Sequence, residues 1–93
     1  MNINIYRDDV CRECDVYVEK MSKWCNEHNA TLKIFYVETD ITLVMNAIIE
    51  SREKGADVDV LPFTIINSGE DEEIYDGMLL TDEEVNTKLE KYI

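Results

Sequence analysis

Two cysteines three positions apart, Cys11 and Cys14, stand where the pattern of the chain changes from a strand to a helix. Residues 2–6 alternate apolar and polar, which predicts a short strand with Ile3 and Ile5 on one face. From Cys11 onward the apolar residues recur at helical spacing. A C-x-x-C pair at such a junction is typical of a dithiol that opens and closes as a disulfide. The sequence therefore predicts a redox site at the start of the first helix.

The positions of the two thiols predict different roles for them. Cys11 lies nearer the helix N-terminus, where free backbone N–H groups and the helix dipole favour a thiolate. We expect Cys11 to attack a substrate disulfide and Cys14 to resolve the mixed disulfide. Two cations, Arg7 and Arg12, favour the thiolate, and four nearby acids oppose it. The acids are Asp8, Asp9, Glu13 and Asp15. The expected pKa of Cys11 is therefore only modestly below that of a free thiol, as suits a reducing protein.

The rest of the pattern predicts an α/β fold in one domain, residues 1–93. Apolar periodicity and turn residues indicate strands at 31–37, 63–66 and 72–76, of which the first is expected to be buried. The first helix ends near His28, and a second is capped by Thr39 or Asp40 and stops at Gly55. The second helix runs through Leu43, Val44, Ala47, Ile48 and Ser51. A last helix begins at Thr81. The order is βαβα followed by ββα, which predicts a four-stranded mixed sheet flanked by helices, with the first two strands parallel.

The composition limits where the protein works and what it binds. No apolar run approaches the ~20 residues that a membrane span needs, and the N-terminus lacks a signal-peptide pattern. We therefore expect a cytoplasmic protein with no membrane partner, in a compartment where structural disulfides are rare. The net charge of −12 disfavours nucleic acid, which requires a basic stripe, and favours basic partner surfaces.

The element order, the C-x-x-C pair and Leu61-Pro62 at the start of the third predicted strand together resemble the thioredoxin superfamily. Gly77 near the end of the hairpin adds to this resemblance, and the short length is similar to the glutaredoxin branch, including small phage-type members. The resemblance covers nearly the whole chain and implies a thioredoxin-like fold and a dithiol–disulfide oxidoreductase that reduces protein disulfides. It also implies that Pro62 is cis and that the Leu61 backbone pairs with the substrate like an added strand.

The resemblance further implies a substrate-binding set around the catalytic pair Cys11 and Cys14. Its members are Arg12, Glu13, Leu61, Pro62, Arg7, Gly77, Thr81 and Asp82. Arg7 takes the place of the lysine that holds a glutathione carboxylate in glutaredoxins, and Thr81-Asp82 that of the polar pair at the last helix. The implied partners are protein disulfides, including one in a ribonucleotide reductase, with thioredoxin reductase or glutathione as reductant. Because Asp8 and Asp9 repel anionic glutathione, the donor stays open; no resident cofactor or metal is expected.

Alternative interpretations use some of the same residues. Cys11, Cys14, Cys25 and His28 match the spacing of a Cys3His zinc site. In a continuous helix, however, Cys14 and Cys25 are about 16 Å apart at ~1.5 Å per residue, which disfavours a shared ion. Cys25 is then a small buried hydrophobe, or alternatively a regulatory thiol. The alternative function is a non-catalytic module that keeps the fold and docks a basic partner through its acidic surface.

Overall fold

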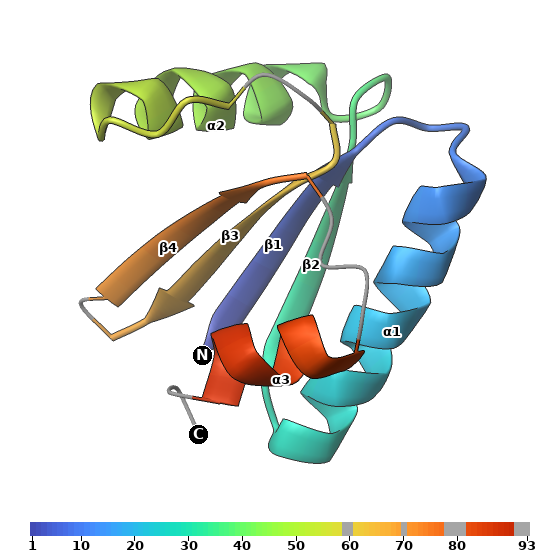
Figure 1. The fold of residues 1–93 in the computed structure, drawn as a ribbon. Helices are drawn as coiled ribbons and strands as arrows, with labels where there is room; N and C mark the ends of the chain where they lie inside the picture. The colour runs from blue at the N-terminus through green and yellow to red at the C-terminus, as the bar shows by residue number, and fades with distance from the viewer. Residues whose placement is uncertain (59–60, 70, 78–81, 91–93) are drawn as a thin grey trace.

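The computed structural model describes residues 1–58, 61–69, 71–77 and 82–90, which form a four-stranded mixed sheet with helices on both faces (Figure 1). The strands are β1 (Asn2–Arg7), β2 (Thr31–Tyr36), β3 (Phe63–Ser68) and β4 (Asp71–Asp76). The helices are α1 (Arg12–His28), α2 (Ile41–Glu53) and α3 (Asp82–Leu89). The predicted α/β class and the order βαβα followed by ββα are confirmed.

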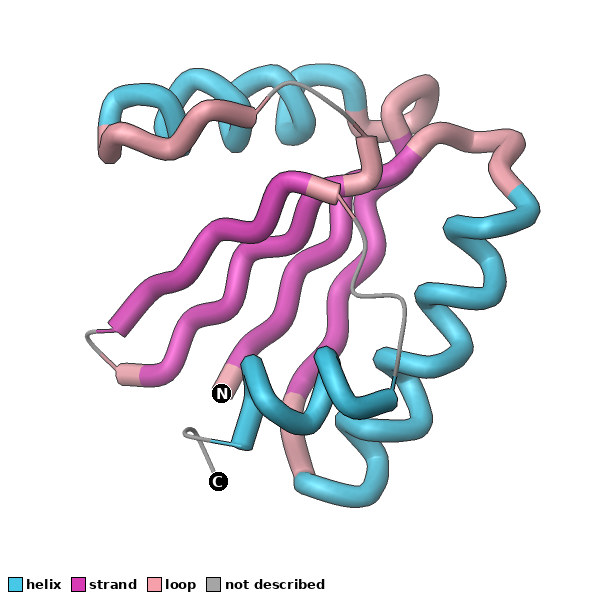
Figure 2. The backbone as a smooth tube through the Cα atoms, viewed as in Figure 1, coloured by secondary structure: helices cyan, strands magenta, loops and turns pink. Residues whose placement is uncertain are grey.

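The strands lie side by side in the order β2-β1-β3-β4 (Figure 2). β1 and β2 are parallel, as predicted, whereas β3 runs antiparallel to both β1 and β4. β1 is therefore a central strand that is hydrogen-bonded on both sides. Its C-terminal end, at Arg7, leads directly into the loop that carries Cys11.

Side chains on opposite faces of β1 belong to two separate hydrophobic clusters. Ile3 and Ile5, two positions apart, pack in one cluster with Met21 of α1 and Leu89 of α3. Tyr6 belongs to the other cluster, which α2 covers. Its other buried members are Val44, Ala47, Val58, Phe63 and Ile65. The sheet is thus the middle layer of three, with α1 and α3 on one face and α2 on the other (Figure 1).

Three aromatic rings cross the sheet at the end of β1 that faces the Cys11 loop. Phe35, Tyr6 and Phe63 occupy paired positions on β2, β1 and β3. The ring centroids of Tyr6 lie 4.8 Å from Phe35 and 4.6 Å from Phe63, in stacked geometry. Stacked aromatic pairs on neighbouring strands stabilise a sheet beyond the area that they bury. The three stacked rings therefore favour the observed pairing of β1 with β2 and β3 beside the predicted redox site.

Helix α1 has defined signals at both ends. Cys11 is the N-cap residue, and its side chain accepts a hydrogen bond from the backbone N–H of Cys14. At the other end Asn29 adopts a left-handed conformation (φ 59°) and donates its N–H to the Cys25 carbonyl. Within the described ranges, no helix has both the length and the apolar character that crossing a bilayer requires.

Two details of packing differ from the sequence prediction. β2 was expected to be buried, but it is an edge strand whose side chains are exposed or only half-buried. Leu43 is grouped with Val44, Ala47 and Ser51 in the predicted second helix, but 53% of it is exposed because α2 packs through the other three. Both errors have one cause: a run of apolar residues does not reveal which neighbours cover it.

The hairpin is longer than predicted. The sequence placed its turn at 67–70, yet Asn67 and Ser68 extend β3 and pair with Glu72 and Asp71. Gly69, with φ 64°, takes the left-handed conformation at the turn. Thr81, the predicted cap of the last helix, lies outside the described residues.

Replacing Phe63 with alanine should lower the free energy of unfolding by about 3–5 kcal/mol, because the ring is fully buried and stacks on Tyr6. Urea unfolding monitored by circular dichroism measures the change. The control is Val10→Ala, at a residue that is 96% exposed, which should change stability by less than about 0.5 kcal/mol. Equal losses in the two variants would contradict the proposed packing.

Candidate functional site

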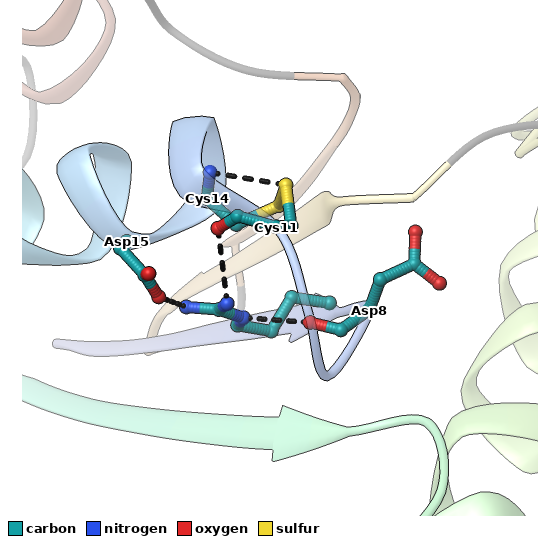
Figure 3. Close-up of a disulfide and its surroundings, with 5 residues drawn as sticks. Asp8, Cys11, Cys14 and Asp15 are labelled. Atoms are coloured by element: carbon teal, nitrogen blue, oxygen red, sulfur yellow. Dashed lines mark hydrogen bonds and ion pairs between the residues drawn. A yellow bond between two sulfur atoms is a disulfide. The ribbon is translucent and has the colours of Figure 1, made fainter.

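Cys11 and Cys14 form a disulfide at the N-terminus of α1, with their Cα atoms 5.2 Å apart (Figure 3). Cys11 precedes the first helical residue in extended conformation, and Cys14 lies within the first turn. Cys11 is half-buried, whereas Cys14 is completely buried. An approaching partner therefore reaches the sulfur of Cys11 before that of Cys14, which is the asymmetry that the sequence predicted.

Hydrogen bonding at the helix start is suited to a charged sulfur. The Cys14 N–H donates to Cys11 Sγ across 3.1 Å. When the disulfide opens, this N–H and the dipole of α1 both stabilise negative charge on Cys11. Glu13 and Asp15, in the same first turn, are exposed and oppose that charge. The arrangement supports thiol–disulfide exchange through Cys11.

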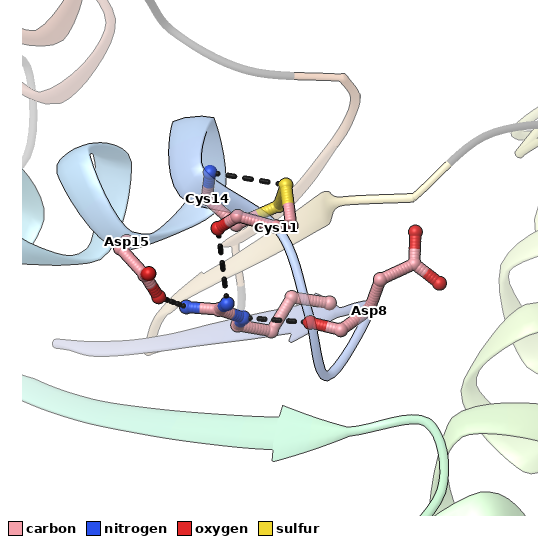
Figure 4. A network of polar contacts seen from close by, with 5 residues as sticks. Asp8, Cys11, Cys14 and Asp15 are labelled. Carbon is pink, nitrogen blue, oxygen red and sulfur yellow. Dashed lines mark hydrogen bonds and ion pairs between the residues drawn. A yellow bond between two sulfur atoms is a disulfide. The ribbon is translucent and has the colours of Figure 1, made fainter.

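Arg7 lies beneath this turn and is only 2% exposed. Its Nε donates to the Asp8 carbonyl (2.9 Å) and its Nη2 to the Cys11 carbonyl (3.2 Å), while Nη1 pairs with the Asp15 carboxylate (2.7 Å; Figure 4). The guanidinium also lies 5.1 Å from the centre of the Tyr36 ring. These contacts are all within the chain.

Leu61 and Pro62 reach the same end of the sheet as the disulfide. The peptide bond between them is cis, which confirms the expectation from the resemblance. Phe63 pairs with Tyr6, so Pro62, the residue before Phe63, lies at the end of the sheet where β1 ends at Arg7. Pro62 is buried, and its carbonyl accepts the Gly77 N–H at 3.0 Å.

The other predicted binding residues that the structure describes are distributed around this end of the sheet. Arg12 and Glu13 are exposed in the first turn of α1. Gly77 follows β4 with φ 92°, a left-handed conformation that favours glycine. Asp82 begins α3, and Thr81 lies beyond the described residues. The structure thus brings the motif, the cis-proline and Gly77 to one end of the sheet.

Cys25 and His28 occupy the opposite end of α1. Cys25 is buried and free, and burial raises the pKa of its thiol to about 11. The ring of His28 stacks on Trp24, with 4.2 Å between centroids. Because α1 is continuous, neither residue can share an ion with the Cys11–Cys14 pair, and the Cys3His interpretation does not fit. Among the described residues, no group of three or more metal-ligating side chains gathers.

Sequence reasoning missed two contacts that shape the site. The Asp9 carboxylate accepts the Glu38 N–H at 2.9 Å and so joins the Cys11 loop to the loop after β2. The hydroxyls of Tyr17 and Thr64 hydrogen-bond at 2.7 Å between α1 and β3. The partners are 29 and 47 positions apart, so no local pattern could have linked them.

Comparisons with known proteins support the fold, and evidence on function comes from the geometry of the site. No protein-family model and no curated protein matches the chain. Solved structures do match, and one of them is described as the structure of a malarial protein. It is similar at 14% identity with a TM-score of 0.69, over 99% of this chain and 96% of that one. The chain is therefore an α/β protein of thioredoxin-like fold that carries a C-x-x-C disulfide.

Cys25 should remain unmodified when the reduced, folded protein is treated with iodoacetamide at pH 8. With a pKa of about 11, only about one Cys25 side chain in a thousand is a thiolate at that pH, and burial also blocks access. Peptide mass spectrometry measures modification of each cysteine. The control is the same reaction in denaturant, where Cys25 should react fully; rapid labelling of Cys25 in the folded protein would contradict this assignment.

Proposed function

We propose that the protein is a small dithiol–disulfide oxidoreductase that reduces disulfides in other proteins. The observation that carries this proposal is the Cys11–Cys14 disulfide at a helix N-terminus, with Cys11 half-buried and Cys14 completely buried. A purely structural disulfide that closes a loop this short would add less stability than one that closes a long loop, because the stabilisation by a cross-link increases with loop length. Reversible exchange is the chemistry that this placement favours.

The reaction begins with both cysteines reduced. The Cys11 thiolate attacks one sulfur of the substrate disulfide, whose other sulfur leaves as a thiolate and takes up a proton. The Cys14 thiol then loses its proton and attacks Cys11 Sγ, which breaks the mixed disulfide and releases the second substrate thiol. The substrate gains two electrons and two protons, and Cys11–Cys14 becomes the disulfide seen in the structure.

The surroundings of Cys11 support a protein as substrate. Val10, immediately before Cys11, is 96% exposed and offers an apolar contact to an arriving chain. Leu61, beside cis-Pro62, lies at the same end of the sheet as Cys11 and would pair through its backbone with an extended substrate segment. The net charge of −12 favours substrates whose disulfide lies on a basic surface. By resemblance, a ribonucleotide reductase is one candidate substrate.

The same surroundings favour a protein reductant over glutathione. The Arg7 guanidinium is enclosed by contacts within the chain, and Asp8 at the surface carries negative charge. Glutathione is an anion at neutral pH and needs a cation to hold its carboxylates. A thioredoxin reductase would recognise a surface instead. Paired assays with each donor identify which one regenerates the dithiol.

Replacing Cys14 with serine should trap the reaction at the mixed disulfide, because Cys11 can still attack but nothing resolves the product. The experiment incubates the variant with insulin or a cell lysate and detects adducts on non-reducing gels. Adducts should disappear on addition of dithiothreitol, and mass spectrometry should place the bond at Cys11.

The matched control is Cys11→Ser, which retains the buried Cys14 and should trap far less. Wild-type protein should reduce insulin in the presence of dithiothreitol faster than either variant does. If neither adducts nor insulin reduction occurs, the oxidoreductase proposal fails. The non-catalytic module that binds a basic partner would then be the better account of the fold.

A further inference from the structure

We propose that Arg7 is a positioning residue of the dithiol: its buried guanidinium holds the Cys11 turn in place and stabilises negative charge on the Cys11 sulfur. The inference rests on the proposed function, because it assigns Arg7 a part in the reactivity of the same cysteine. It differs from the role implied by resemblance, in which Arg7 binds a carboxylate of the substrate.

Strand geometry places Arg7 under the helix. Side chains two positions apart share one face of a strand, so Arg7 lies on the face of Ile3 and Ile5, which α1 and α3 cover. Tyr36 is the residue paired with Arg7 on β2, and its ring lies against the guanidinium. Arg7 is consequently fixed between a strand, an aromatic ring and the first turn of α1.

The guanidinium joins the dithiol to the rest of the protein. The Cys11 carbonyl accepts both the Asp15 N–H of the helix (3.1 Å) and Nη2 of Arg7 (3.2 Å). Nη1 of the same group contacts the Asp15 carboxylate at 2.7 Å. Arg7 thus contacts both ends of the first helical turn, which contains both sulfurs (Figure 4). A planar fork makes these contacts together, which a lysine ammonium cannot do.

The positive charge of Arg7 is close to Cys11 and poorly screened. Bond lengths alone place Cys11 Sγ within about 9 Å of Nη2, because the carbonyl that Nη2 contacts belongs to the same residue. Arg7 is 2% exposed, whereas its carboxylate partner Asp15 is 69% exposed and largely solvated. A buried charge acts through protein, where the effective dielectric constant is lower than in water, so its effect on a neighbouring thiolate is greater than that of a surface charge.

Other charged and titratable groups lie on the elements that neighbour this turn. The acids are Asp8 and Asp9 of the Cys11 loop, Glu13 and Asp15 of α1, Glu38 after β2, and Asp76 at the end of β4. Arg12 adds an exposed cation, and the Tyr36 hydroxyl is a further titratable group on β2. Within the described ranges Arg7 is therefore the buried cation of the site, and it opposes a group of acids that are mainly at the surface.

The test is a pH titration of Cys11 alkylation by iodoacetamide in a Cys14→Ser background, which requires no oxidoreductase activity. Arg7→Gln removes the charge but keeps an N–H donor, and should move the midpoint upward and slow alkylation at pH 7 by about three- to tenfold. Arg7→Lys keeps the charge and should leave the midpoint near its original value. Arg52→Met lowers the net charge equally at the far end of α2 and should not move it.

A residue with a merely structural role would lower thermal stability in both Arg7 variants without separating their titration midpoints. A midpoint in Arg7→Gln equal to or below that of the Cys14→Ser parent would overturn the proposal. If Arg7→Gln does not fold, Tyr36→Ala decides, because it exposes the guanidinium to water without changing the charge. Its midpoint should rise, and an unchanged midpoint would overturn the proposal. Failure of insulin reduction with a normal Arg7 effect would count against the proposed function alone.

Discussion

The central strand β1 is the constraint on which the rest of the structure depends. It is paired on both sides and covered on both faces, and its alternation assigns Ile3, Ile5 and Arg7 to α1 and Tyr6 to α2. A shift of one residue in its register would move the apolar side chains to the wrong faces and Arg7 away from the helix. The stacked rings beside Tyr6 oppose such a shift. The packing of β1 therefore determines where the Cys11–Cys14 pair lies.

Helix α1 holds cysteines in two contrasting environments. At its N-terminus Cys11 receives a backbone N–H, the helix dipole and a nearby buried cation, all of which favour a thiolate. Near its C-terminus Cys25 is surrounded by apolar side chains, and burial raises its pKa. The same residue type is thus suited to exchange at one end of the helix and to packing at the other. The position of each cysteine along α1 therefore accounts for the difference in chemistry between Cys11 and Cys25.

Much of this site could be predicted from the sequence because its signals are local. The C-x-x-C spacing, the strand before it and the helical stripe after it define the dithiol, and resemblance supplied the cis-proline. The burial of Arg7 was not predicted. Arg7 lies two positions after Ile5, so the strand pattern predicts which face of the sheet it occupies, but that pattern does not identify the residues that contact it there. The exposure of β2 and Leu43 was missed for a similar reason: strand order in a sheet is set by long-range pairing.

The central claim is that Cys11 and Cys14 form a reversible redox pair. The most direct measurement equilibrates the protein in dithiothreitol buffers of defined potential, quenches with an alkylating agent and determines the mass of each cysteine-containing peptide. A two-electron transition is predicted, with the ratio of disulfide to dithiol changing tenfold per ~30 mV, and with Cys25 reduced throughout. A Cys11–Cys14 bond that fails to open and reclose reversibly, or a disulfide that includes Cys25, would contradict the account.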